Sequence, residues 1–125
     1  MLKQSTLIAS LFQAGALAQT FLPADKSDPY FSKFADLALE KGVEWEPYEV
    51  ETSDGWQLSL FRLTGRTGQY SKRFEEAEHS DKYPLYFAHG GDMDASNWLK
   101  SWSAELMDHG YDIWLGNYRG GTFGN

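Results

Sequence analysis

The stretch Leu85-Tyr86-Phe87-Ala88-His89-Gly90-Gly91 decides the fold of this 125-residue chain. Its first four residues form an unbroken apolar run, which is typical of a strand covered on both faces, as strands of a parallel sheet are. The run ends at once in a histidine and two glycines. A strand that stops at a glycine pair indicates the carboxyl edge of an α/β sheet, where ligands bind in such folds.

The residues after this stretch predict one helix and a second short strand. A helix is expected from Trp98 to about His109, closed by Gly110, and a strand is expected over Tyr111–Leu115. Strand, helix and strand joined by short connections predict a parallel pair with a right-handed crossover. The glycine-rich end, residues 119–125, shows no element of its own. Three residues at helical spacing are interpreted as core positions rather than as a lipid-contacting stripe: Trp98, Trp102 and Leu106.

A helix and a hairpin are predicted upstream. Asp28-Pro29 is typical of a helix N-cap followed by proline at the first helical position, and Gly42 would end a helix over residues 29–41. Strands are predicted over residues 45–53 and 56–63, with Asp54-Gly55 as a two-residue turn. The polar residues 64–82 indicate a solvated loop, with a helical turn around residues 73–78 as its one candidate element.

This order of elements predicts an α/β protein in which an antiparallel hairpin leads into a parallel sheet. The chain holds a single crossover unit, so a sheet of so few strands would leave apolar faces uncovered. We therefore expect an incomplete α/β fold, with residues 29–125 forming a partial domain.

The first 18 residues have the layout of a secretory signal. Lys3 supplies the positive charge, an apolar stretch runs from Leu7 to Leu17, and Ala16-Leu17-Ala18 predicts cleavage before Gln19. The stretch is too short to cross a bilayer of about 30 Å, and no transmembrane segment is expected elsewhere. An amphipathic first helix of the domain is the alternative. The prediction is a signal peptide over residues 1–18 and a polar leader over residues 19–28.

Composition argues against several classes of function. The net charge of −7 argues against nucleic acid or anionic membranes as partners. The absence of cysteine excludes disulfides and thiolate metal sites. The spacing of His79, His89 and His109 does not suit a metal-ligand set, so neither a metal nor a cofactor is expected. The loop carboxylates Asp92 and Asp94 are interpreted as solvated or capping groups, with Asp94 or Ser96 capping the next helix.

The candidate functional loop is His89-Gly90-Gly91. Glycine lets the backbone turn sharply without a Cβ clash, so the Gly91 N–H can face a negative charge that develops in a cleft. Removing one such donor commonly lowers a rate by about 10²–10³. The pattern alone is weak evidence for a functional loop, because an ordinary tight turn after a strand can have the same residues.

Three further segments make the pattern specific: Asp94–Trp98, Gly110–Asn117 with Arg119-Gly120, and Glu49–Arg62. Together with the loop they resemble the N-terminal part of the acid lipase family (gastric and lysosomal acid lipases and their relatives) in the α/β-hydrolase superfamily. The similarity runs from about Pro29 to Gly121. The resemblance implies a serine hydrolase in lipid metabolism that is secreted or lysosomal and acts on neutral lipid esters.

The resemblance also implies roles for the loop. Gly91 would supply one oxyanion-hole N–H, while His89 and Gly90 would support the loop, with His89 not the catalytic base. The family usually has leucine at the Gly91 position, but a backbone donor needs no side chain. The second glycine makes the loop less preorganised, and Tyr118 replaces a smaller residue of the family. The helix from Trp98 is also shorter than usual.

The nucleophile of an α/β-hydrolase lies in G-x-S-x-G and is followed by the acid and the histidine. None of seven serines has that frame: Ser53, Ser59, Ser71, Ser80, Ser96, Ser101 and Ser103. We therefore expect the N-terminal region of a lipase, inactive by itself, whose nucleophile, acid and base follow Asn125. The alternatives are a non-catalytic secreted protein that binds lipid or a partner, and a fragment of another α/β-hydrolase, which the run at residues 110–120 disfavours.

Overall fold

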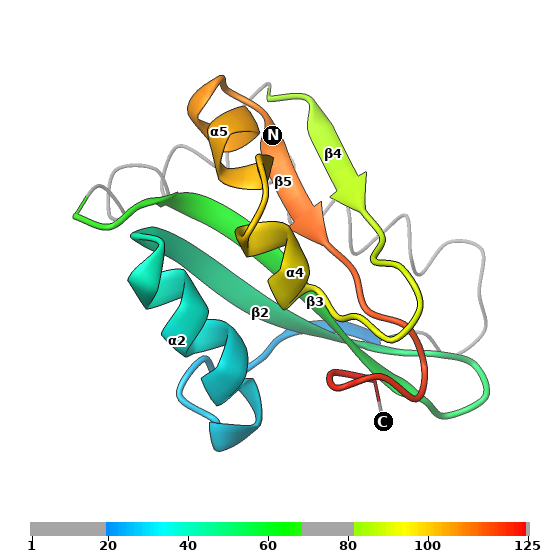
Figure 1. Ribbon diagram of the computed structural model, residues 1–125. Helices are drawn as coiled ribbons and strands as arrows, with labels where there is room; N and C mark the ends of the chain where they lie inside the picture. Colours follow the sequence, from blue (N-terminus) through cyan, green and yellow to red (C-terminus); the bar gives the residue numbers. More distant parts are fainter. Residues whose placement is uncertain (1–19, 69–81, 125) are drawn as a thin grey trace.

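The computed structural model describes residues 20–68 and 82–124 of the chain (Figure 1). Its elements in chain order are β1 (Thr20–Pro23), the 3-10 turn η1 (Pro29–Phe31), α2 (Ser32–Glu40), β2 (Val43–Glu51), β3 (Gln57–Arg66), β4 (Pro84–Phe87), α4 (Ser96–Leu99), α5 (Ser103–Asp108) and β5 (Asp112–Leu115). The predicted signal peptide and the predicted helical turn at residues 73–78 lie outside the described residues.

The described strands form one mixed sheet in the order β1-β2-β3-β5-β4. The pairs β1/β2, β2/β3 and β3/β5 are antiparallel, and β4/β5 are parallel, with Leu85 opposite Ile113 and Phe87 opposite Leu115. The helices α4 and α5 lie in the connection between the two parallel strands. The predicted fold class, a hairpin that leads into a parallel sheet, is confirmed.

The hairpin turn differs from the prediction. The Thr52 N–H donates to the Trp56 carbonyl at 2.8 Å, so the loop holds three residues, Ser53–Gly55, instead of two. Gly55 has φ +88°, the left-handed conformation that ends three-residue hairpin loops and that glycine adopts without strain. The Thr52 hydroxyl accepts a hydrogen bond from the Trp56 N–H at 3.1 Å, which tightens the same turn.

The strand β3 runs to Arg66, three residues beyond its predicted end. The polarity of residues 64–66 predicts a solvated loop, and this prediction is wrong. Thr64 is buried, and Arg66 forms an ion pair with Asp108 of α5. A long-range partner therefore keeps this polar end of the strand in the sheet.

Part of the predicted leader is a strand. Residues 20–23 form β1, which pairs antiparallel with β2. Phe21 is buried, and its ring stacks on Tyr48 with centroids 4.8 Å apart. A four-residue strand with one such anchor shows no periodicity in the sequence, so it could not be recognised there.

The helix start and stop predicted at residues 28–42 are confirmed. The Asp28 carboxylate accepts the Tyr30 N–H at 2.9 Å, and Pro29 opens η1, which leads directly into α2. Gly42 follows with φ +65°. α2 is the longest helix in the described part of the chain at nine residues, and none there is long and apolar enough to cross a membrane.

The single helix predicted from Trp98 to His109 is wrong, because two short helices replace it. α4 ends at Leu99 and α5 begins at Ser103. The buried Ser103 hydroxyl donates to the Trp98 carbonyl at 2.6 Å, and a side chain that bonds a backbone carbonyl competes with the helical ladder. The break leaves Trp102 53% exposed, against the core position expected for it, although its ring still packs against Phe87.

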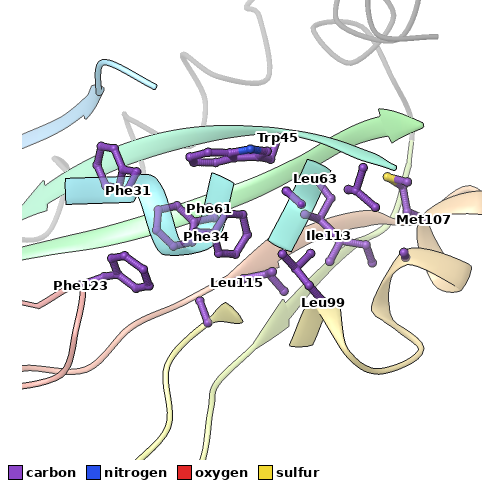
Figure 2. Packing of buried hydrophobic residues seen from close by; sticks show 14 residues of the cluster. Phe31, Phe34, Trp45, Phe61, Leu63, Leu99, Met107, Ile113, Leu115 and Phe123 are labelled. Atoms are coloured by element: carbon purple, nitrogen blue, oxygen red, sulfur yellow. The ribbon is translucent and has the colours of Figure 1, made fainter. Parts of the chain in front are cut away.

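The main core lies between one face of the sheet and the helices α2, α4 and α5 (Figures 1 and 2). Aromatic rings dominate it, with Phe34 and Phe61 at its centre and their centroids 4.1 Å apart. Phe123, from the glycine-rich end that showed no element, is fully buried, and its ring lies 5.1 Å from that of Phe61. The end of the described chain therefore closes this core.

The opposite face of the sheet carries a smaller cluster of four residues: Phe21, Tyr48, Leu60 and Trp114. No described helix contributes to it. β4 lies at one edge of the sheet, and its residue Tyr86 is 62% exposed. The expectation that residues 85–88 are covered on both faces is therefore wrong for the described chain, which has the incompletely covered sheet expected of an incomplete fold.

Candidate oxyanion loop and its polar supports

The three residues predicted for the site lie at the carboxyl end of the parallel strands. His89, Gly90 and Gly91 follow β4, and the segment at residues 116–122 follows its parallel neighbour β5. The two segments share a polar hollow of about 470 Å³. Its lining is His89, Gly90, Gly91, Asp92, Met93, Tyr118, Arg119, Gly120, Gly121 and Thr122. This is the edge of an open α/β sheet at which ligands bind.

The backbone turns at a different residue from the one expected. Neither Gly90 nor Gly91 has a positive φ, whereas Asp92 has φ +57°, a conformation that Asp tolerates better than most residues. A Cβ on Gly91 would meet no atom within 4 Å, and one on Gly90 would reach the Met93 Sδ at 3.5 Å, an ordinary contact. The glycines are therefore not needed for the turn itself. Their effect is to leave the hollow open.

The Gly91 N–H has no hydrogen-bond partner among the described residues. Gly91 is exposed on the hollow, and its N–H makes no hydrogen bond of normal geometry to another residue that the structure describes. A backbone N–H without a partner at a water-accessible edge can donate a hydrogen bond to a negatively charged oxygen. Such preorganised donors stabilise charge that develops during a reaction.

His89 is buried, and both of its ring nitrogens are engaged. The Tyr118 N–H donates to Nε2 at 3.3 Å, so Nε2 is an acceptor and the proton lies on Nδ1. Nδ1 then donates to the Gly90 carbonyl at 2.8 Å. The imidazole also meets the Tyr118 ring edge to face, with centroids 4.6 Å apart. Neither nitrogen is left to take a proton from a substrate, and the ring joins the two segments of the site.

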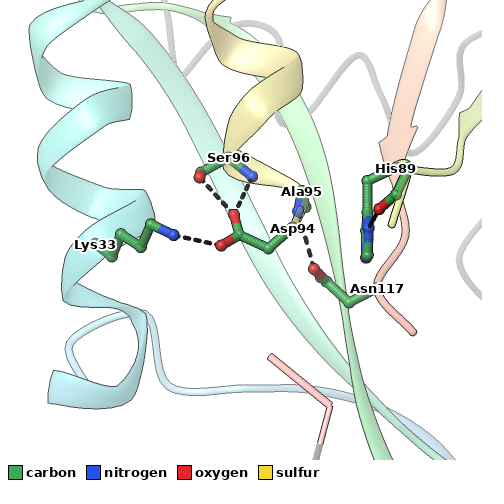
Figure 3. A network of polar contacts seen from close by, with 7 residues as sticks. Lys33, His89, Asp94, Ala95, Ser96 and Asn117 are labelled. Carbon is green, nitrogen blue, oxygen red and sulfur yellow. Dashed lines mark hydrogen bonds and ion pairs between the residues drawn. The ribbon is translucent and has the colours of Figure 1, made fainter. Parts of the chain in front are cut away.

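Asp94 is a buried carboxylate at the far end of the loop (Figure 3). It pairs with Lys33 of α2 and accepts hydrogen bonds from the Ser96 N–H, at 2.9 Å, and from the Ser96 hydroxyl. Burial alone would raise the pKa of Asp94, but the hydrogen bonds from Lys33, Ser96 and Thr122 outweigh it and lower the pKa to about 2. Neither Asp94 nor Ser96 is the N-cap residue of α4, as was expected, because Ala95 occupies that position and makes no side-chain cap hydrogen bond. The ionised carboxylate of Asp94 instead connects three parts of the chain.

Asn117 is a site residue that sequence reasoning did not single out. Its side chain is buried at the end of β5 and makes two hydrogen bonds. Oδ1 accepts the Ala95 N–H at 3.0 Å (Figure 3), and Nδ2 donates to the Ser59 carbonyl at 2.8 Å. It therefore fixes the second half of the loop to β3. An asparagine directly after a glycine at a strand end is the only local signal of this role.

A second hollow, of about 380 Å³, opens on the uncovered face of the sheet. Its lining is mainly apolar and includes Val50, Leu58, Leu60, Pro84, Tyr86 and Trp114, with Asn117 at one end. No group of three or more His, Asp or Glu side chains suited to a metal occurs among residues 20–68 and 82–124. The described chain thus has a polar hollow beside Gly91 and a mainly apolar hollow on the uncovered face of the sheet.

A hairpin that leads into a parallel crossover, with a glycine loop at the carboxyl edge, is the arrangement expected of the first part of an α/β-hydrolase. A family model described as a partial alpha/beta-hydrolase lipase region matches residues 34–102. The chain belongs to this family, and the resemblance seen in its motifs is confirmed.

Named relatives extend the match beyond that region. A putative lysosomal acid lipase/cholesteryl ester hydrolase of Crotalus adamanteus is 35% identical over 125 residues, which cover 94% of this chain and 30% of that protein. A gastric triacylglycerol lipase of Mus musculus is 39% identical over 88 residues, covering 66% of this chain and 20% of that protein. A probable lipase of Schizosaccharomyces pombe is 33% identical over 95 residues, which cover 70% of this chain and 19% of that protein. The chain spans less than a third of the length of these relatives.

Proposed function

We propose that this chain is the N-terminal region of a lipid ester hydrolase in which the Gly91 N–H is one of the oxyanion donors. The observation that carries the proposal is the free Gly91 N–H on a polar hollow, directly after a strand of the parallel pair. Membership in the lipase family supports the reaction class. The names of the relatives, with triacylglycerol and cholesteryl ester as substrates, support neutral lipid esters as the substrate class.

The proposed role follows from the chemistry of ester hydrolysis. Attack on the ester carbonyl places a negative charge on its oxygen, and an α/β-hydrolase binds that oxygen with two backbone N–H groups. One comes from the residue after the nucleophile, and the other comes from a loop that follows a parallel strand. Gly91 suits the second position. The nucleophile, the acid and the base would come from sequence outside these 125 residues, so this chain alone would not turn over substrate.

His89 and Gly90 are proposed as supports of the loop. The two hydrogen bonds of the imidazole occupy both nitrogens, and burial keeps the ring in place. A general base needs an acceptor nitrogen within reach of the proton that it removes. We therefore assign His89 a structural role and expect the catalytic histidine elsewhere in the complete enzyme.

The proposed function is tested by removing the N–H of Gly91 in the complete polypeptide that carries G-x-S-x-G. Gly91→Pro removes the donor, and kcat for a neutral lipid ester should fall by about 10²–10³. Gly91→Ala keeps the donor and puts its Cβ into open space, so its kcat should stay close to that of the wild type. Equal activity of the two variants would reject Gly91 as a donor.

We further propose that residues 1–18 are a signal peptide and that the mature chain is secreted or lysosomal. The charged, apolar and small-residue segments support this. Mass spectrometry of the protein made by a eukaryotic secretory host should find Gln19 as the first residue. An N-terminus at Met1 in the purified protein would contradict the proposal.

The second candidate is a non-catalytic protein that binds lipid. The apolar hollow beside Trp114 and Leu60 favours it, because an open apolar surface can accept an acyl chain. Quenching of tryptophan fluorescence by a nonhydrolysable ether lipid would distinguish the two. Binding by the 125-residue chain that is lost in Leu60→Asp would support this candidate, and absence of binding would remove it.

A further inference from the structure

The loop of the proposed donor is held by side chains at its two ends. No N–H of residues 90–93 makes a hydrogen bond of normal geometry to another described residue. His89 fixes the first end through the Tyr118 N–H, and Asp94 lies at the second end. The direction of the Gly91 N–H therefore depends on where these two anchors sit.

Asp94 reaches three separate elements from one buried position. Its carboxylate pairs with Lys33 of α2, accepts hydrogen bonds from Ser96 at the start of α4, and interacts with Thr122 of the final turn. The Asp94 side chain is 4% exposed, whereas that of Lys33 is 57% exposed. Figure 3 shows the ammonium of Lys33 entering from α2 and meeting the carboxylate on the side away from Asn117.

From this arrangement we infer that Asp94 is a positioning residue for the Gly91 donor and that Lys33 holds it in place from α2. The inference rests on the proposed function, since it concerns the geometry of the same oxyanion loop. Neither side chain lines the hollow, so neither touches the substrate.

The opposite charges of Asp94 and Lys33 attach the loop to α2. Ser96 and Thr122 can satisfy a neutral acceptor at position 94, but only a charged group holds the Lys33 ammonium against water. Charge-assisted hydrogen bonds of this kind are shorter and stronger than neutral ones. Loss of either charge would free the loop from α2 while the Ser96 contact remains. The core packing of α2 through Phe34 and Ala38 would also remain.

The test measures backbone order in the ¹⁵N-labelled 125-residue chain. In the wild type the Gly91 order parameter should lie near the rigid value of about 0.85, and in Lys33→Gln and Asp94→Asn it should fall below about 0.6. Lys33→Arg keeps the charge and should restore the wild-type value. The Phe61 amide in the core reports on the fold and should not change in any variant.

Four results of this measurement would overturn the inference. The first is a Gly91 order parameter unchanged in both neutral variants, and the second is a wild-type value already below about 0.6. The third is a loss of order at Phe61 equal to that at Gly91, because the pair would then serve the fold as a whole. Failure of Lys33→Arg to restore order would likewise show that charge is not the cause.

A kinetic measurement on the complete enzyme separates this inference from the proposed function. Lys33→Gln should lower kcat about tenfold with KM unchanged, within the range of up to about 10² for misplaced groups remote from the chemistry. A loosened loop with unchanged kcat would reject Gly91 as a donor but leave the anchoring role of Asp94 intact. A lowered kcat with an ordered loop would reject the anchoring role.

Discussion

Replacing Asn117 with alanine removes a side chain that joins the segment after the candidate loop to β3. Two hydrogen bonds are lost, from the Ala95 N–H to Oδ1 and from Nδ2 to the Ser59 carbonyl. Asn117 is 6% exposed and Ala95 is fully buried, so the small side chain of alanine gives water little access to these groups. Both backbone groups are then left without a partner.

The expected magnitude follows from those two groups. A buried donor or acceptor without a partner costs about 1–3 kcal/mol, so the loss of two partners in Asn117→Ala should lower the free energy of unfolding by about 2–6 kcal/mol. The matched control is Asn97→Ala, since the Asn97 side chain makes no hydrogen bond to another described residue. A change of about 0.5 kcal/mol or less is expected for this control.

The assay is urea unfolding of the 125-residue chain, followed by tryptophan fluorescence and by circular dichroism. Both probes should give the same transition midpoint for each variant. Amide exchange at Ala95 should also become faster in Asn117→Ala than in Asn97→Ala. A loss of less than about 1 kcal/mol relative to the control would refute the view that Asn117 fixes the loop.

Other perturbations test other parts of the structure. Arg62→Ala breaks a buried ion pair with Asp112 (Nε to Oδ1 2.8 Å) and should lower the free energy of unfolding by about 3–5 kcal/mol; a loss below about 1 kcal/mol would contradict this. Gly124→Ala would place a Cβ 2.1 Å from the Tyr118 carbonyl oxygen. The free energy of unfolding should therefore fall by about 1–3 kcal/mol, which lowers the thermal midpoint. An unchanged midpoint would contradict that contact. Since the pKa of Asp94 is lowered to about 2, its stabilisation should be complete above about pH 4 and lost as the pH falls towards 2. The wild type should therefore lose about 2 kcal/mol more than Asp94→Asn over that range, and equal losses would disprove the depressed pKa.

The sequence predicted those elements whose pattern is local. The alternating strands of the hairpin, the cap at Asp28 and the apolar runs of β4 and β5 each reflect contacts within a few residues or a repeat with a clear period. β1 and the burial of Phe123 depend on partners far along the chain, and neither has a period. The break between α4 and α5 depends on one serine hydroxyl, which sequence alone does not distinguish from an exposed one.

The candidate loop and its support by His89 were predicted by motif, whereas the contacts that Asp94 and Asn117 make were not. His89, Gly90 and Gly91 stood out because glycines follow an apolar strand and because the flanking segments resemble a lipase. The ion pair of Asp94 joins residues 61 positions apart, and no spacing rule points to it. The sequence also placed the sharp turn at the glycines, whereas Asp92 holds the left-handed conformation.

The most direct test of the account follows the Gly91 amide itself. A phosphonate that reacts with the nucleophilic serine of the complete enzyme places a charged oxygen where the oxyanion would form. In the glycine-¹⁵N-labelled enzyme, the Gly91 amide proton should move downfield on phosphonylation, because it then donates to that oxygen, while the Gly90 amide proton should stay nearly in place. A Gly91 resonance that does not move while the serine is fully phosphonylated would contradict the central claim.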